Sequence, residues 1–160
     1  MTDKTAFTED EWATLVRSPM VAGMAITFAD PGGPIEVLKE TAAVLKFVTA
    51  DTAARDDLVG AIAGEVRALA EQRTNPLGGF KPQGAMAGKQ ILEELSRANG
   101  IVSEKAAPDE AEAFRAWIRE CAQRAADAAK EGGFMGFKAV RVSEGEQKML
   151  DEVASALGSQ

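Results

Sequence analysis

The chain has 160 residues and a formal net charge of −7, from 18 Lys and Arg against 25 Asp and Glu. Its 46% hydrophobic and 27% charged residues are close to the averages of folded domains, which argues against disorder and favours one domain over residues 1–160. The basic residues form no cluster, so nucleic acid is not expected as a partner. There is no His and one Cys, which excludes His-dependent nucleophilic catalysis and an internal disulfide.

The N-terminal segment is polar and acidic, and the longest apolar stretch, residues 19–29, has 11 residues. A helix needs roughly 20 apolar residues to span a bilayer. We therefore expect no signal peptide, no membrane insertion and a cytoplasmic protein, with Cys121 reduced.

The hydrophobic period is helical almost throughout, which predicts an all-α, single-domain bundle of six to seven helices. The first helix is expected to begin with a capping box formed by Thr8 and Glu11. Pro19 should break or kink it, because proline removes a helical N–H donor. A second segment over residues 19–29 then directs Met24 and Phe28 inward.

The next helix is predicted from Pro34 to about residue 49, with a buried face formed by Ile35, Leu38, Ala42, Leu45 and Val48. Asp51 or Thr52 is expected to cap a helix over residues 52–72, on which Glu65 leans from the rim into water. Residues 73–84 contain three glycines and two prolines, which predicts a long loop.

Three further helices complete the predicted bundle. The first, over residues 85–98, buries Met86, Ile91, Leu92 and Leu95, and a connection follows it. The second, over residues 109–130, is expected to be central, with a buried stripe of Phe114, Trp117, Ile118, Cys121 and Ala125. The third follows the glycine-rich segment 131–142 and begins with a capping box formed by Ser143 and Glu146.

Three features of the sequence are candidates for carrying chemistry. Residues 84–90, GAMAGKQ, lack the spacing and the Ser or Thr of a phosphate-binding loop. Cys121 lies on an apolar face and is interpreted as a core residue. Phe134 and Phe137 form either a partner-binding patch or a cover over the core.

The acidic turn at residues 28–40, FADPGGPIEVLKE, places Glu36 and Glu40 one helical turn apart, with Asp30 nearby. One interpretation is helix-start electrostatics, with Lys39 pairing to Glu36. The other is a site made of Asp30, Glu36 and Glu40 for a cation that prefers oxygen ligands, namely Ca²⁺, Mg²⁺ or Mn²⁺.

Three segments lead from a turn into an acidic helix start: ADPGGPIEVLKE (29–40), ANGIVSEKAAPDEAEAF (98–114) and KAVRVSEGEQKML (138–150). They resemble the turns of TerB-like domains, small helical bundles named for bacterial tellurite resistance. The resemblance implies an acidic metal-binding turn, with Asp30, Glu36 and Glu40 in that role, and a place in stress-response assemblies. Asn99 departs from the pattern, because the family has an acidic residue there.

The sequence therefore favours a non-enzymatic interaction or stress-associated module that binds a protein partner, with a divalent cation at the acidic turn. Two alternatives remain open. One is a structural or adaptor subunit of a larger assembly, which uses Phe134 and Phe137 and is compatible with a homo-oligomer. The other is a carboxylate-metal enzyme, which requires Glu65 or Glu120 to face a pocket near Asp30.

Overall fold

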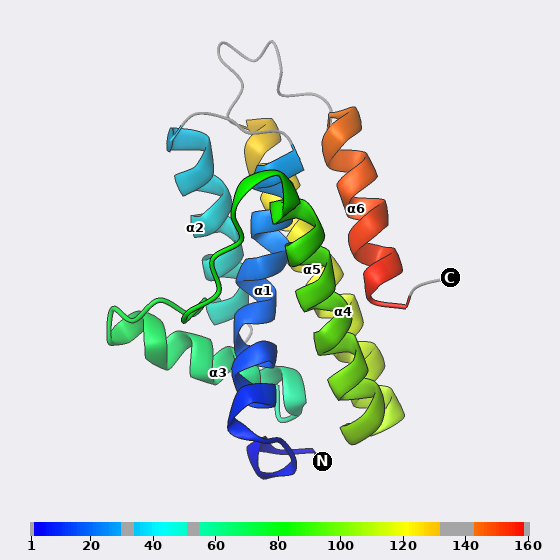
Figure 1. Ribbon diagram of the computed structural model, residues 1–160. Coiled ribbons are helices and arrows are strands. Elements are labelled where there is room, and N and C mark those ends of the chain that lie inside the picture. Colours follow the sequence, from blue (N-terminus) through cyan, green and yellow to red (C-terminus); the bar gives the residue numbers. More distant parts are fainter. Residues whose placement is uncertain (1, 30–33, 51–54, 132–142, 159–160) are drawn as a thin grey trace.

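The computed structural model describes residues 2–29, 34–50, 55–131 and 143–158, apart from the side chains of residues 34, 36, 130 and 131. Over these residues the protein is an all-α bundle without strands (Figure 1). Its six α-helices are α1 (Glu9–Ala29), α2 (Pro34–Ala50), α3 (Leu58–Glu71), α4 (Ala87–Lys105), α5 (Pro108–Glu131) and α6 (Glu144–Ala156). Two 3₁₀ turns, η1 (Lys4–Ala6) and η3 (Gly84–Met86), precede α1 and α4. The predicted all-α bundle is confirmed.

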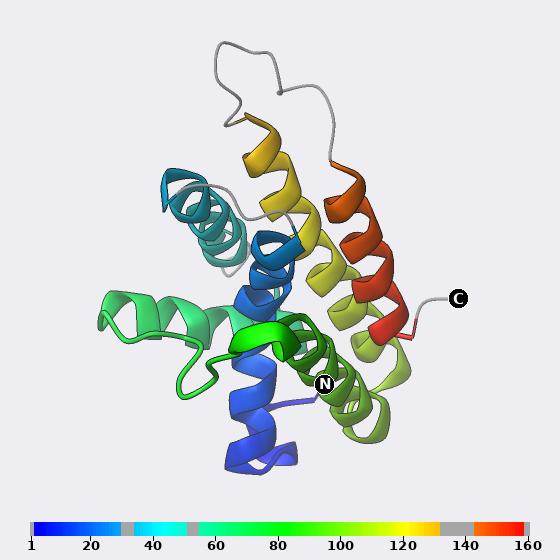
Figure 2. The same cartoon turned by 45° about the horizontal axis from the view of Figure 1, so that its top comes forward.

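Helices α1 and α5 form the centre of the bundle. They contact each other, and each of them contacts all four remaining helices. Helix α3 lies across the other helices, which share one general direction, and the α3–α4 loop crosses in front of α1 (Figures 1 and 2). The prediction that the helix at 109–130 is central is therefore confirmed. No helix in the described part of the chain has the length and apolar character needed to cross a membrane.

The core is formed by side chains from every helix, and the predicted stripe of α5 is buried as expected. Phe114 and Ile118 are fully buried, as is Cys121. The Phe114 ring centroid lies 6.5 Å from that of Trp117 in a tilted arrangement. Such aromatic pairs add modestly to the free energy gained from burying the rings.

Helix α1 continues through Pro19, so the predicted break is wrong. Pro19 lies inside the helix and is buried. Leu15 before it in the sequence and Ile26 after it are both fully buried. The Ser18 hydroxyl donates a hydrogen bond of 2.7 Å to the Thr14 carbonyl. Packing of α1 against five other helices offsets the cost of a proline inside a helix, about 3 kcal/mol.

Local capping signals were predicted with mixed success. Both capping boxes are present: Thr8 and Glu11 bond reciprocally at the start of α1, and Ser143 and Glu146 do so at α6. The predicted cap of α3 is wrong, because that helix begins later and Asp57 caps it by accepting from the Gly60 N–H.

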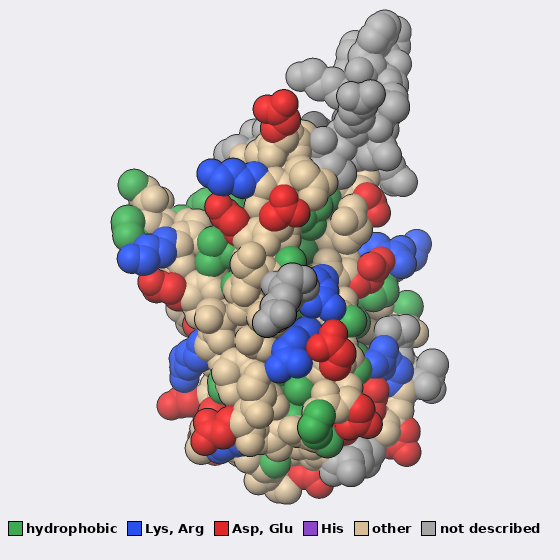
Figure 3. All heavy atoms as spheres, turned by 90° about the vertical axis from the view of Figure 1, so that its right-hand side faces the viewer, with side chains coloured by type: hydrophobic (Ala, Val, Ile, Leu, Met, Phe, Trp, Pro, Cys, Tyr) green, Lys and Arg blue, Asp and Glu red, His purple; other side chains and the backbone are tan. Residues whose placement is uncertain are grey.

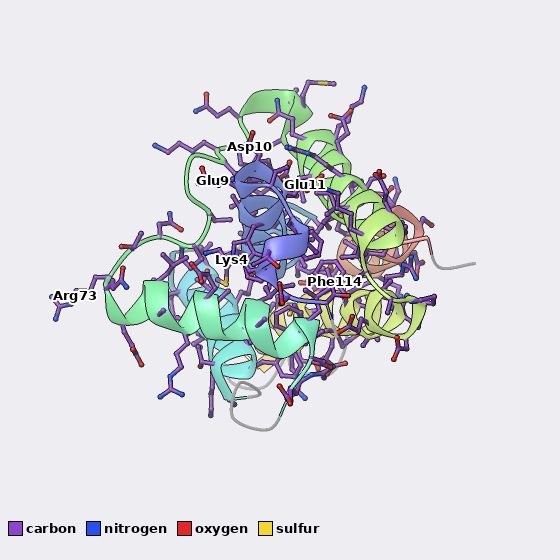
Figure 4. All side chains as sticks on the ribbon, turned by 90° about the horizontal axis from the view of Figure 1, so that it is seen from below. Lys4, Glu9, Asp10, Glu11, Arg73 and Phe114 are labelled. Carbon is purple, nitrogen blue, oxygen red and sulfur yellow. The ribbon has the colours of Figure 1, made fainter. Side chains whose placement is uncertain are left out.

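At the N-terminal end of α1, polar contacts tie the chain terminus to the α4–α5 turn. The Thr2 N–H donates to both carboxylate oxygens of buried Glu110, at 2.9 and 3.1 Å. Burial alone raises the pKa of Glu110, but the hydrogen bonds from Thr2, together with a smaller contribution from the Leu58 backbone, help to lower the pKa below its usual value. Glu11, in the acidic first turn of α1 (Figure 4), bonds to Lys105 at 2.7 Å, and this contact lowers the Glu11 pKa.

The buried face of α2 differs from the predicted one. Val44 and Val48 are fully buried, whereas Ile35 and Leu38 are 66% and 69% exposed. The cause lies on α1, where a Cβ atom at Gly23 would stand 2.9 Å from the Val44 Cγ2 atom. Because only a glycine leaves this space, the helices meet at Val44, and this contact decides which stripe of α2 is buried.

Helix α4 is longer than predicted, and residues expected to connect it to the next helix are helical to Lys105. Ala98 and Val102 are fully buried, so the apolar stripe of the helix extends into the residues that were expected to form a connection. Asn99 accepts a hydrogen bond of 2.7 Å from Arg115 on α5, which fixes a residue otherwise typical of turns. Met86 precedes the helix and is 52% exposed, not buried.

Candidate functional site

A pocket of about 200 Å³ lies between α1 and α2, on the side where the α3–α4 loop passes. We call it the α1–α2 pocket. The residues that line it come from α1, from α2 and from the α3–α4 loop. They are Met20, Gly23, Met24, Thr27 and Phe28 of α1, Val37, Thr41 and Val44 of α2, and Leu77 of the loop. In Figure 1 the two helices stand side by side and the loop runs up from α3 in front of α1.

The sequence of α1 explains why a pocket forms here. Met20, Met24 and Phe28 recur every four residues and therefore share one face of the helix. Gly23 has no side chain, so α2 approaches closely at that level. Methionine side chains are unbranched and adapt to irregular contacts, which suits a wall that accommodates a guest.

The polar side chains of the pocket are already hydrogen-bonded within the protein. The Thr27 hydroxyl donates to the Glu40 carboxylate, and the Thr41 hydroxyl donates to the Val37 carbonyl at 2.8 Å. Glu40 is 2% exposed and does not line the pocket. The pocket therefore offers a guest mainly apolar contacts.

Exposed apolar side chains adjoin the pocket. Phe28, which lines it, is 43% exposed. Leu38 is exposed on α2 and lies three residues before Thr41, which lines the pocket, so these two side chains are neighbours on the helix surface. Ile35 is also exposed, but it lies two residues from Val37 and therefore points away from the pocket. We call Phe28 and Leu38 the apolar rim.

The acidic residues predicted from the sequence are only partly within the described structure. Glu40 is buried and accepts a hydrogen bond from the Thr27 hydroxyl on α1, whereas a carboxylate that binds a cation from solvent would be accessible. Glu36 lies in α2, but its side chain is outside the described residues, as is all of Asp30. The cation site predicted from these three residues therefore stays a prediction. Among the described residues, no group of three or more His, Cys, Asp or Glu side chains is placed to hold a metal ion.

The other predicted sites are resolved only in part. Phe134 and Phe137 lie outside the described residues, so the predicted docking patch stays a prediction. Glu65 is on the rim of α3, as expected, 3.9 Å from Lys4. Glu120 forms an exposed ion pair of 2.9 Å with Arg124.

No known protein family and no related protein helps to interpret this pocket. Comparisons of the chain with protein-family models, curated proteins and solved structures found no match. The TerB-like character suggested by the turn motifs remains a prediction. The α1–α2 pocket and its apolar rim are therefore interpreted from their own contacts.

Sequence reasoning missed this pocket for identifiable reasons. Phe28 and Leu38 were both expected inside, yet they lie on the rim. Leu77 comes from a loop in which periodicity carries no information. The one available signal was the repeat of Met20, Met24 and Phe28, which is equally typical of an ordinary core stripe.

A glycine substitution tests the close approach of α1 and α2. We expect Gly23→Ala to lower the free energy of unfolding by about 1–3 kcal/mol, because the new methyl group would overlap the fully buried Val44 side chain. Urea denaturation followed by circular dichroism measures the change. In the double variant Gly23→Ala/Val44→Ala the two changes should cost less than their sum. Additive costs would show that these residues do not share a contact.

Proposed function

We propose that this protein is a non-enzymatic helical interaction module that binds an amphipathic helix of a partner protein at the α1–α2 pocket. The observation that carries the proposal is an apolar pocket that opens beside the exposed apolar rim. Exposed apolar groups that gather in one place are typical of binding surfaces, whereas single ones are ordinary.

The size and chemistry of the pocket favour one large apolar side chain as its guest. A cavity of 150 Å³ lined by apolar groups accepts benzene, so about 200 Å³ is sufficient for a Leu or Phe side chain. The Thr27 and Thr41 hydroxyls have their hydrogen bonds inside the protein, so a polar guest gains little from them. Phe28 and Leu38 would then contact neighbouring apolar residues on the same face of the incoming helix.

The test uses amphipathic helical peptides selected from a displayed library against the intact protein, with ¹³C-methyl methionine as the reporter. We expect bound peptides to shift the methyl resonances of Met20 and Met24 and to bind at least about tenfold more weakly to Leu38→Ser. The Leu38 side chain is 69% exposed, so the variant should keep its melting temperature.

The matched control is Met86→Ser, which removes an exposed apolar side chain that lies outside the pocket and its rim. It should bind the peptides as the unmodified chain does. Peptides that bind the Leu38→Ser variant with full affinity and leave the Met20 and Met24 resonances unmoved would contradict the proposal.

A further inference from the structure

A second hollow, of about 550 Å³, lies on a different part of the surface and shares no lining residue with the α1–α2 pocket. Arg17 of α1 forms one wall, Phe80 and Lys81 of the α3–α4 loop form another, and Gln90, Glu94 and Arg97 of α4 complete it. We call it the α1–α4 hollow. Figures 1 and 2 show how the loop brings these parts together, since it crosses α1 before it enters α4. Its size is within the range of small-molecule sites.

Arg17 is held in place by contacts on two sides. Its Nη1 atom lies 3.2 Å from the Glu94 carboxylate, and the two side chains are 19% and 11% exposed. The Phe80 ring centroid lies 6.0 Å from the guanidinium carbon. Among the described residues, Glu94 is the one hydrogen-bond acceptor of this guanidinium, and the buried Nε atom has none. A preordered guanidinium with unused N–H groups is suited to binding an oxyanion.

The charge of the α1–α4 hollow is opposite in sign to that of the whole chain. Three cationic and two anionic side chains line it, so its net charge is +1, whereas the chain carries −7. Glu94 is engaged by Arg17, and Glu93 lies 3.8 Å from Lys89. Neither Lys81 nor Arg97 forms an ion pair with any residue that the structure describes. Two cationic groups therefore remain available to a ligand.

Gln90 adds a neutral donor to this set. Its Oε1 atom accepts a hydrogen bond of 3.1 Å from the Gln83 backbone N–H, which fixes the amide and leaves its NH₂ group to donate. We propose that the α1–α4 hollow binds the oxyanion group of a small molecule, a carboxylate or a phosphate, through Arg17, Lys81 and Arg97. This site is independent of the proposed peptide-binding function.

The test is a titration of the intact ¹⁵N-labelled protein with inorganic phosphate and, separately, with acetate, at constant ionic strength set by chloride. We expect saturable shifts of the Gly79 and Gln90 amide resonances. In Lys81→Gln/Arg97→Gln the apparent Kd should rise at least about tenfold. Both substituted side chains are exposed, so this variant should melt as the unmodified protein does.

Lys148→Gln serves as the control, because it removes one positive charge from α6, outside the hollow, and should leave the titration unchanged. Saturation by phosphate alone would identify a phosphate-bearing ligand, and saturation by both probes would identify a general oxyanion site. Shifts that never saturate, or that are equal in the Lys81→Gln/Arg97→Gln variant, would overturn the proposal.

Discussion

Phe114→Ala is expected to lower the free energy of unfolding by about 3–5 kcal/mol, because it removes an aromatic ring from the centre of the bundle. Phe114 is fully buried on α5, one of the two helices that contact all others. Seen from below, its side chain points inward among the helices (Figure 4). A loss of this size is a large part of the stability of a domain with 160 residues, for which 5–15 kcal/mol is typical.

Urea denaturation monitored by circular dichroism and by tryptophan fluorescence provides the measurement. Trp117, whose ring lies 6.5 Å from that of Phe114, should report the change locally. Phe114→Leu is the matched control and should cost clearly less, since it keeps a large apolar side chain in the same space. Equal and small losses in both variants would show that this region of α5 is not packed as described.

The parts of the fold that follow from local chemistry were predictable from the sequence. The two capping boxes depend on residues three positions apart, Thr8 with Glu11 and Ser143 with Glu146, so no knowledge of the rest of the chain is needed. The buried stripe of α5 was equally clear, because its apolar residues recur along a single face.

Features that depend on two distant segments could not be predicted. Helix α2 offers two apolar stripes, and Gly23 on α1 decides which is buried by admitting Val44. Glu40 has the sequence character of an exposed acid, yet the Thr27 hydroxyl on α1 supplies a partner for it inside the bundle. Pro19 predicts a break from local chemistry alone, and tertiary packing overrides it.

The candidate sites show the same division. The α1–α2 pocket requires α1, α2 and Leu77 of a long loop to meet, and the α1–α4 hollow requires that loop to bring Phe80 and Lys81 beside Arg17. The spacing of residues along one segment cannot predict either of these contacts between distant segments. The acidic turn was noticed because its residues are neighbours in sequence, and that criterion also drew attention to Glu40, which is buried.

The start of α3 provides the second large expected effect. Gly60→Ala should lower the free energy of unfolding by about 2–3 kcal/mol, combining local overpacking with loss of the helix cap. A Cβ atom at this position would overlap the Arg55 carbonyl oxygen, a backbone atom that cannot rotate away as a side chain can. Asp57 accepts from the Gly60 N–H at 2.9 Å, so moving the chain to relieve the overlap separates the cap from its donor.

The Asp57 carboxyl gives this prediction a second measurement. A hydrogen bond from Arg55 lowers the pKa of Asp57 below its ordinary value of 3.8, and the Gly60 N–H contributes in the same direction. In Gly60→Ala an NMR titration should therefore find the Asp57 pKa returned toward that value. Gly100→Ala is the control, because a Cβ atom there meets nothing within 4 Å, and it should stabilise α4 by about 0.5–1 kcal/mol. If both glycine variants gained stability, the chain at Arg55 could not lie over the first turn of α3.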